Sequence, residues 1–294
     1  MKVGLQIPRF DWPGSPDNIG STLADVARAA DAAGFSSIWV MDHFFQIAPG
    51  LGAPDSPMME AYSALSFIAG VTQRPKLGAM VSAVTYRVPG HLIKAATTLD
   101  VLSGGRAILG IGAGWYEHEA MGLGLPFPPL KERFERLEEA LQIAHQVWKN
   151  DRSPFNGKHY HLTEPILGPQ PLSKPHPPIL IGGGGENKTL RLVAQYADGC
   201  NLFARIGDEQ LTHKLNILKD HCAKLGRNYD DILKTFLDTV DLRPGQTKPK
   251  DVVEHFKHMA DLGFGYAIFN MPEYHDLKVF ETIGKEIIPA VAGF

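Results

Sequence analysis

Short apolar runs alternate along this chain with longer segments in which apolar residues recur every three or four positions. Short runs are typical of buried parallel strands, and the longer spacing is typical of helices that cover a sheet. In the segment 17–34, for example, Ile19 and Leu23 lie on one helical face. That segment stops at Gly34, and glycine is a common helix terminator.

Eight such pairs of a strand and a helix follow one another. This repeat is typical of a (β/α)8 TIM barrel, whereas the alternative, a doubly wound open sheet, usually has fewer units. We therefore predict an α/β protein with a (β/α)8 TIM barrel in one domain, 1–294. The predicted strands are 2–7, 36–41, 76–84, 106–112, 177–182, 198–203, 232–240 and 265–270, and the predicted helices are 17–34, 61–73, 92–103, 131–150, 188–197, 208–226, 250–263 and 276–288.

Three connections are longer than the usual links of such a barrel. Residues 42–60 follow the second strand, and residues 113–130 follow the fourth strand. Residues 151–175 follow the fourth helix, and their pattern predicts a hairpin with a proline-rich return. The first two connections belong to the C-terminal face of the barrel, where enzymes of this fold carry their active sites.

Composition narrows the function classes. The 294 residues carry a formal net charge of −3, which gives no electrostatic footprint for nucleic acid or an anionic membrane. No stretch approaches the roughly 18 apolar residues of a transmembrane helix, and the start MKVGLQIPRF predicts a strand rather than a signal peptide. Cys200 and Cys222 form no C-x-x-C motif, which suits a reducing cytosol. We therefore expect a cytoplasmic protein.

Asp42 and His43 directly follow the second predicted strand, in WVMDHFF. This position places both residues at the catalytic rim of the barrel, where a histidine can exchange a proton near neutral pH. The alternative is a histidine that ties the loop to a backbone carbonyl. Asp42 could orient His43 or cap the loop.

Glycines alternate at the end of the fourth strand, where LGIGAGW contains Gly110, Gly112 and Gly114. Such glycines allow a flat ring or a phosphate group to approach the backbone. Crowding inside the barrel is the alternative reason for their presence.

Four consecutive glycines, Gly182 to Gly185, join the fifth strand to its helix. Free N–H groups at a helix N-terminus attract anions, so we expect a phosphate group here. Lys188 could add charge or face solvent. The loop misses the ATP-binding P-loop pattern because Asn187 replaces a glycine, and the chain order of the strands also argues against an ATPase.

Three further groups are interpreted as structural. His159 and His161 share one side of the predicted hairpin without a cysteine or carboxylate pair nearby, so we expect no metal site there. Asp100 and Arg106 flank a helix stop and are predicted to form an ion pair. The glutamates of the helix 131–150 are expected on its solvated face.

The segments WVMDHFF, TTLDVLSGGRAILGIGAGW, ERFERLEEAL and PPILIGGGGENKTLRLVAQYADGCNL together resemble the bacterial-luciferase-like barrels over nearly the whole chain. Within that superfamily they are most similar to the coenzyme F420-dependent oxidoreductases. The resemblance implies a barrel that binds a deazaflavin at its C-terminal rim and transfers a hydride between the deazaflavin C5 and a small organic substrate. It also implies a homodimer or a higher homo-oligomer.

The resemblance also implies a set of site residues. The ring would rest at the end of the third strand, where the family has a non-prolyl cis peptide bond that falls at Met80–Val81 by register. His43 would donate or accept the proton, and the glycine loop would hold the cofactor phosphate. The implied cofactor-binding residues are Asp42, His43, Met80, Val81, Ala83, Ala113, Gly114, Trp115, His118, Gly182, Gly183, Gly184 and Gly185.

One departure concerns the branch of this family that acts on glucose 6-phosphate, in which a glutamate directly follows the glycine run. Here that position is Trp115, and Glu117 lies two residues further on. The departure argues against oxidation of a sugar phosphate. Reduction of an activated C=C, C=N or nitro compound then fits as well as oxidation of an alcohol.

Two alternatives remain open. An FMN-dependent luciferase-like monooxygenase would place FMN in the same site, because the FMN phosphate ends a similar arm. A non-redox barrel would use the glycine loop to hold a phosphorylated substrate. The identity of the substrate depends on the loops 44–60 and 115–130 and on the segment near Arg205, whose aromatic residues and prolines suggest a mostly apolar pocket.

Overall fold

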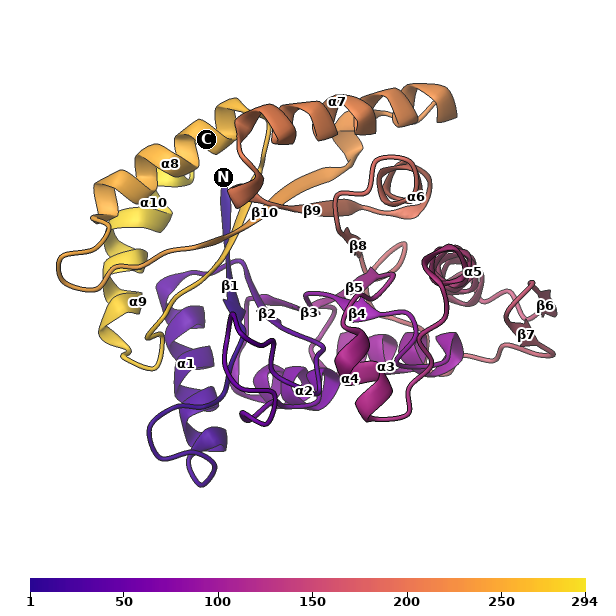
Figure 1. The fold of residues 1–294 in the computed structure, drawn as a ribbon, viewed down its shortest axis with the longest axis horizontal. Coiled ribbons are helices and arrows are strands. Elements are labelled where there is room, and N and C mark those ends of the chain that lie inside the picture. The colour runs from indigo at the N-terminus through magenta and orange to yellow at the C-terminus, as the bar shows by residue number, and fades with distance from the viewer.

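Parallel pairing closes the main sheet into a barrel in the computed structural model, which describes residues 1–294 (Figure 1). The strand order is β3-β2-β1-β11-β10-β9-β8-β5-β4, and an additional pairing of β3 with β5 completes the ring. The predicted TIM barrel is therefore confirmed. The strands are β1 (Lys2–Ile7), β2 (Ser37–Val40), β3 (Lys76–Ala79), β4 (Ser82–Ala83), β5 (Ala107–Gly112), β8 (Ile179–Gly182), β9 (Gly199–Phe203), β10 (Leu233–Thr239) and β11 (Tyr266–Asn270).

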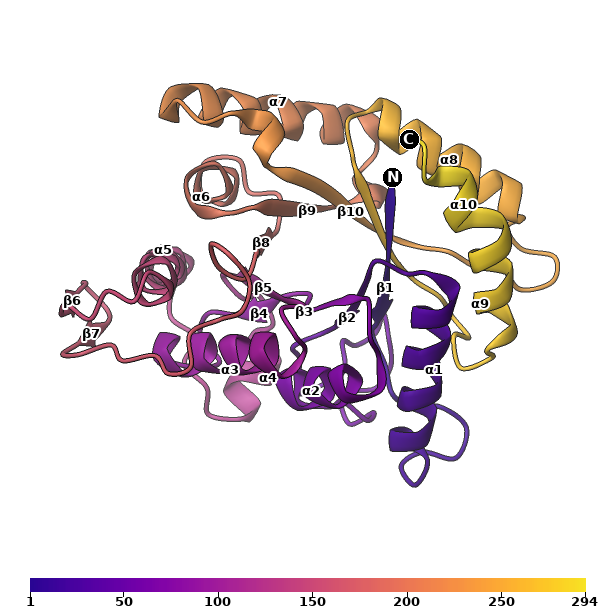
Figure 2. The same ribbon diagram turned by 180° about the vertical axis from the view of Figure 1, so that it is seen from behind.

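Helices surround the barrel on its outside, as both views show (Figures 1 and 2). No helix is both long enough and apolar enough to cross a membrane. The hairpin β6 (Phe155–Asn156) and β7 (His161–Leu162) projects outward beside α5. The helices are α1 (Ile19–Ala33), α2 (Ala61–Val71), α3 (Pro89–Leu102), α4 (Glu117–Gly122), α5 (Leu130–Trp148), α6 (Thr189–Tyr196), α7 (Asp208–Leu225), α8 (Pro249–Asp261), α9 (Lys278–Thr282) and α10 (Ile288–Val291), with a π-helical turn (Ile283–Ile287) between the last two.

Two separate apolar clusters form the core. The larger cluster includes buried residues of the barrel strands and of the helices packed around them. The smaller one is built from β2, β8, β11 and the bend between β3 and β4, and contains Trp39, Met80, Leu180, Tyr266 and Ile268. A barrel of this size fills its interior with side chains, so its chemistry belongs at the rim.

The third barrel strand is interrupted. The segment predicted as one strand forms β3 and β4, and the Met80–Val81 peptide bond between them is cis, as the resemblance implied. A Cβ atom on Gly182 would lie 2.9 Å from both methyl groups of Val81. A Cβ atom on Gly110 would lie only 1.8 Å from the carbonyl oxygen of Ala79. Crowding inside the barrel therefore explains the absence of a side chain at both glycines.

The predicted ion pair between Asp100 and Arg106 is wrong. The Arg106 guanidinium donates to backbone carbonyls in the segment 69–75, which close the turn after α2. The Asp100 carboxylate instead accepts from the backbone N–H groups of Leu172 and Ser173, at 2.8 and 2.9 Å. Each side chain satisfies backbone groups of a distant loop, and local sequence does not reveal such partners.

Two glutamates of α5 are not on a purely solvated face, contrary to expectation. Glu139 accepts from the backbone N–H groups of Lys158 and Tyr160, at 2.7 and 2.9 Å. His159 Nε2 lies 2.8 Å from Glu135 Oε2. These contacts attach the hairpin to the barrel through α5.

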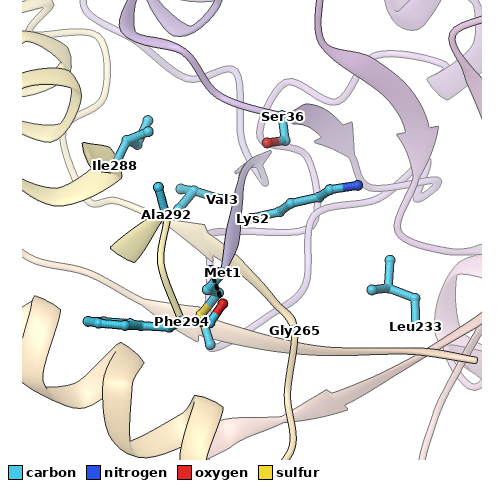
Figure 3. Close-up of a pocket in the computed structure, with 9 residues that line it drawn as sticks. All are labelled: Met1, Lys2, Val3, Ser36, Leu233, Gly265, Ile288, Ala292 and Phe294. Atoms are coloured by element: carbon cyan, nitrogen blue, oxygen red, sulfur yellow. Dashed lines mark hydrogen bonds between the residues drawn. The ribbon is translucent and has the colours of Figure 1, made fainter. Parts of the chain in front are cut away.

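A cavity of about 440 Å³ lies at the N-terminal end of the barrel strands (Figure 3). Met1 and the first two residues of β1, Lys2 and Val3, contribute to its lining, together with Phe294 from the other end of the chain. Residues at this face of a TIM barrel serve stability, and the reacting groups lie at the opposite face. The cavity is therefore separate from the candidate site.

Candidate active site

His43 follows β2 and contacts a carboxylate from α4. Its Nδ1 atom lies 3.0 Å from Oε1 of Glu119, a side chain with no solvent exposure. The Tyr86 hydroxyl donates to the same oxygen. The other carboxylate oxygen accepts the backbone N–H groups of Phe44 and Phe45, the latter at 2.7 Å. One buried carboxylate therefore holds the loop after β2, the segment after β4, and α4 together.

These donors keep the Glu119 carboxylate ionised. Burial alone would raise the pKa of Glu119, but the hydrogen bonds from His43, Tyr86 and Phe45 outweigh it and hold that pKa below its ordinary value. Burial and the hydrogen bond to Glu119 both raise the pKa of Tyr86, so its hydroxyl keeps its proton and donates.

Asp42 does not contact His43 in this arrangement. Its carboxylate, which is 1% exposed, accepts two hydrogen bonds from the Arg87 guanidinium, at 2.5 and 2.9 Å. The guanidinium also pairs with Glu60 at the start of α2 and lies over the Tyr62 ring, 5.2 Å from its centroid. Asp42 thus fixes the start of the loop, and its predicted contact with a cofactor stays a prediction.

Aromatic rings surround the other side of His43. Trp115 is 60% exposed, and its ring meets the His43 ring edge-on at 5.7 Å. Trp115 also stacks on Tyr116, with ring centroids 5.0 Å apart. His118 lies against Phe45 at 5.6 Å, so it joins the same group of rings. The exposed Trp115 beside His43 offers an apolar flat surface to a ligand.

The hydroxyl of Thr85, which follows β4, is buried near the end of β5 and has no hydrogen-bond partner. Thr85 is 6% exposed, and its Oγ1 atom has no hydrogen-bond partner. Gly114 is adjacent, because a Cβ atom built there would lie 3.5 Å from that hydroxyl and 3.1 Å from the Cβ of Ala83. An unsatisfied buried polar group costs about 1–3 kcal/mol, which a ligand with a polar group at this point would offset.

The glycine loop presents free backbone donors. Gly183 donates its N–H weakly to the Asn201 carbonyl, at 3.4 Å. The N–H groups of Gly184 and Gly185 donate to no acceptor in the protein. Unpaired N–H groups ahead of a helix attract anions, and the phosphate group expected at this loop stays a prediction.

The positive charge at this loop comes from a residue that the sequence did not indicate. Lys214 of α7 donates from Nζ to the Gly184 carbonyl at 2.9 Å and pairs with Glu186 at 3.2 Å. Lys188 lies instead over the Phe134 ring, 5.2 Å from its centroid. The lysine beside the glycines is therefore Lys214.

A second cavity, of about 490 Å³, lies among the loops that follow β1, β10 and β11, at the same end of the barrel as His43. Two arginines line it, and both are already neutralised. Arg9 pairs with Asp11 at 2.6 Å, and Arg243 pairs with Asp241 at 2.7 Å. The cavity therefore offers a polar surface without an unpaired cation.

Comparison with known proteins identifies the family. The family model described as luciferase-like monooxygenase matches residues 1–240 of this chain. The chain belongs to the luciferase-like monooxygenase family. Its sequence is also 34% identical to that of the F420-dependent glucose-6-phosphate dehydrogenase of Intrasporangium calvum, over 100% of this chain and 99% of that protein.

Solved structures confirm the luciferase-like fold. An F420-dependent secondary alcohol dehydrogenase, in complex with an F420-acetone adduct, has a TM-score of 0.81 with 18% identity, covering 99% of this chain and 98% of that one. A monooxygenase from Streptomyces bottropensis has a TM-score of 0.82 with 17% identity, covering 98% and 99%. At these identities the likeness concerns the fold alone.

The structure places the predicted residues in three groups, and their contact with a cofactor stays a prediction. His43, Trp115 and His118 belong to the group of rings at the rim, with Ala113 just ahead of it in the chain. Met80, Val81, Ala83 and Gly114 lie at the ends of the third and fourth barrel strands. Gly182, Gly183, Gly184 and Gly185 form the loop after β8. Sequence reasoning missed Glu119, Tyr86, Thr85, Arg87 and Lys214.

Only a weak signal could have revealed Glu119. In the segment EHEAMG, Glu117 and Glu119 are equivalent by composition, and the short helix gives little periodicity. Ala120, also buried, marks the inner face of α4 on which Glu119 lies. The partners of Glu119 on the loop after β2 are more than 70 positions away in the chain.

Replacing Asp42 by Asn tests the role of its pair with Arg87. We expect Asp42→Asn to lower the free energy of unfolding by about 3 kcal/mol, because Arg87 then lies buried without its main counter-charge. Urea denaturation measures this change. The matched control is Asp25→Asn in the exposed pair with Arg28, which should cost less than about 1 kcal/mol. Equal losses of unfolding free energy in Asp42→Asn and Asp25→Asn would contradict the role of the buried pair of Asp42 and Arg87.

Proposed function

We propose that residues 1–294 form a single domain with F420-dependent oxidoreductase activity, which transfers a hydride between the deazaflavin C5 and a small organic substrate. The observation that carries the proposal is His43, held by a buried carboxylate beside the exposed Trp115 at the barrel rim. The named activity of the relative from Intrasporangium calvum supports F420 as the cofactor.

The residues at the rim fit such a cofactor. The free N–H groups of Gly184 and Gly185 suit its phosphate, and Lys214, which is paired with Glu186, lies at the edge of the loop. The unpartnered Thr85 hydroxyl, beside the slot that Gly114 leaves open, suits a polar edge of a flat ring. When bound, the deazaflavin supplies the carbon that gains or loses the hydride.

The proposed set of cofactor contacts has three parts. His43, Asp42, Trp115 and His118 would lie around the ring, and the backbone at the ends of the third and fourth barrel strands would support it. The phosphate would lie on the glycine loop. The full set is Asp42, His43, Met80, Val81, Ala83, Ala113, Gly114, Trp115, His118, Gly182, Gly183, Gly184 and Gly185.

His43 carries the proton transfer in this proposal. When a hydride leaves a carbinol carbon, the hydroxyl proton must leave as well, and an imidazole at the rim accepts it near neutral pH. In the reductive direction, the imidazolium returns that proton to the substrate. Both directions use the same residue.

The substrate of this proposal is a small organic molecule without a phosphate group. Trp115 presents an exposed apolar ring where the glucose-6-phosphate branch has a glutamate. The polar cavity at the same rim has no unpaired cation for a phosphate, since Arg9 and Arg243 are paired with Asp11 and Asp241. An alcohol, or an activated C=C, C=N or nitro compound, fits these surroundings.

An FMN-dependent monooxygenase is the second candidate. The match to the luciferase-like monooxygenase model favours it. The glycine loop would accept the FMN phosphate by the same backbone contacts.

The proposal also includes a cytoplasmic location and a homodimer or higher homo-oligomer. Analytical ultracentrifugation of the purified protein would measure the oligomeric state.

Titration of the purified protein with F420 and with FMN, followed by fluorescence, tests the proposal. We expect a micromolar or lower Kd for F420 and a Kd for FMN at least about tenfold higher (about 1.4 kcal/mol). His43→Asn should raise the Kd for F420 by about fivefold, the loss of one contact, and lower kcat on an accepted substrate by about 10²–10⁴-fold. Tighter binding of FMN than of F420 would favour the FMN-dependent monooxygenase. Binding of neither cofactor would favour a non-redox barrel.

Replacing Thr85 by Val tests the unpartnered hydroxyl. We expect the Kd for F420 to rise about fivefold, the worth of one hydrogen bond of about 1 kcal/mol. The melting temperature should stay equal or rise, because no contact within the protein is lost. The matched control is Thr97→Val, since the Thr97 hydroxyl accepts from Trp148 at 2.9 Å. The control should lower the melting temperature and leave the Kd unchanged. A raised Kd for F420 in Thr97→Val, together with an unchanged Kd and a lower melting temperature in Thr85→Val, would contradict the proposed contact between Thr85 and the cofactor.

A further inference from the structure

The contacts of Glu119 determine which nitrogen of His43 carries a hydrogen. An ionised carboxylate can only accept hydrogen bonds, and the low pKa of Glu119 keeps it ionised at neutral pH. The atom of His43 that faces it is Nδ1, at 3.0 Å from Oε1. Nδ1 must therefore carry the hydrogen, and in neutral His43 the Nε2 atom has a free lone pair.

We propose that Glu119 is a positioning residue that fixes His43 as the Nδ1–H tautomer and stabilises its imidazolium form. Nε2 is then the atom that exchanges a proton with the substrate. The assignment rests on the proposed function for its chemical meaning, but the tautomer and the charge coupling are properties of the protein without any ligand.

No other charged side chain competes for this role. The rings that face His43 belong to Trp115 and Tyr116, at 5.7 and 5.8 Å. The nearby Asp42 carboxylate is bound by Arg87, on the side of Tyr62 and Glu60.

Two further titratable residues of α4 also have other neighbours. His118 lies against the rings of Phe45 and Tyr116. Glu117 lies near Arg133 and contributes to the pKa of that guanidinium. Glu119 is therefore the carboxylate that acts directly on the imidazole.

The remaining donors hold the carboxylate in place. Tyr86 binds the same oxygen as His43, whereas Phe44 and Phe45 bind the other oxygen through their backbone N–H groups. Because both oxygens are occupied, the carboxylate cannot rotate away from the imidazole without loss of several hydrogen bonds. The same backbone contacts fix the loop that carries His43, so the orientation of the ring and the course of the loop depend on one group.

The chemical balance follows from this arrangement. In the oxidation of an alcohol, the carbinol C–H bond would break and its hydride would pass to the deazaflavin of the proposed function. The hydroxyl O–H bond breaks, a C=O bond forms, and the proton passes to His43 Nε2. Glu119 stays ionised and stabilises the new imidazolium, as the buried aspartate does for the histidine of a serine hydrolase. In reduction, each transfer runs in reverse.

NMR of the ligand-free protein, with ¹⁵N-labelled histidine, tests the assignment without reference to the reaction. We expect the His43 signals to show a protonated Nδ1 and an unprotonated Nε2 in the neutral imidazole. In Glu119→Gln, the backbone N–H groups of Phe44 and Phe45 hold the amide oxygen, so the amide N–H faces Nδ1 and the Nε2–H tautomer should appear. The control is Glu117→Gln, an exposed glutamate of the same helix, which should keep the Nδ1–H tautomer.

A second variant covers the case in which Glu119→Gln does not fold. Tyr86→Phe keeps the carboxylate and removes one of its donors, so His43 should keep the Nδ1–H tautomer. The Nε2–H tautomer should therefore appear in Glu119→Gln and not in Tyr86→Phe, which loss of structure alone does not produce. With F420 and an accepted substrate, Glu119→Gln should lower kcat about 10–100-fold and leave the Kd for F420 within about twofold, consistent with a loss of proton transfer.

An Nε2–H tautomer in the wild-type protein would overturn the assignment, and so would the same tautomer in Glu119→Gln and in Tyr86→Phe. A confirmed tautomer in a protein that fails to bind F420 would refute the proposed function and leave the pairing of His43 with Glu119 intact.

Discussion

The buried carboxylate of Glu119 joins three segments that the barrel brings to one rim. It takes hydrogen bonds from the loop after β2, from Tyr86 beyond β4, and from the His43 ring. Removing a charge from water is costly unless its hydrogen-bonding capacity is filled, and here both oxygens are filled. The loop after β2 therefore has a defined course, and His43 has a defined orientation, because of a single ionised group.

A second buried charge has a different part in the same region. Asp42 is next to His43 in the chain, yet its carboxylate faces Arg87 and forms a pair under the rings of Tyr62 and Phe44. Adjacent residues thus have different partners. Asp42 fixes the start of the loop through Arg87, and His43 contacts Glu119.

Local pattern was sufficient to predict the barrel. Strands and helices depend on the spacing of apolar residues within each segment, and all eight predicted strand positions are present. The glycine loop and the position of His43 after β2 were also local features. The cis bond at Met80–Val81 was predicted only from the resemblance, since nothing in the composition of KLGAMVSAV requires it.

Contacts between distant segments could not be predicted in this way. Glu119 acts on a histidine 76 positions earlier, Lys214 reaches a glycine 30 positions earlier, and Arg106 binds carbonyls rather than the nearby Asp100. In each case, a long polar side chain satisfies a group that becomes a neighbour only when the barrel closes. A single sequence specifies which residues are polar, and the closed barrel decides which partners they meet.

The most direct test of the central claim is a crystal structure of this protein with F420 bound. The account predicts the phosphate on the N–H groups of Gly184 and Gly185, the deazaflavin ring against the Met80–Val81 bond, and His43 Nε2 on the side of the ring where substrate binds. A cofactor phosphate bound elsewhere, for example beside Arg9 and Arg243 in the polar cavity, would contradict it.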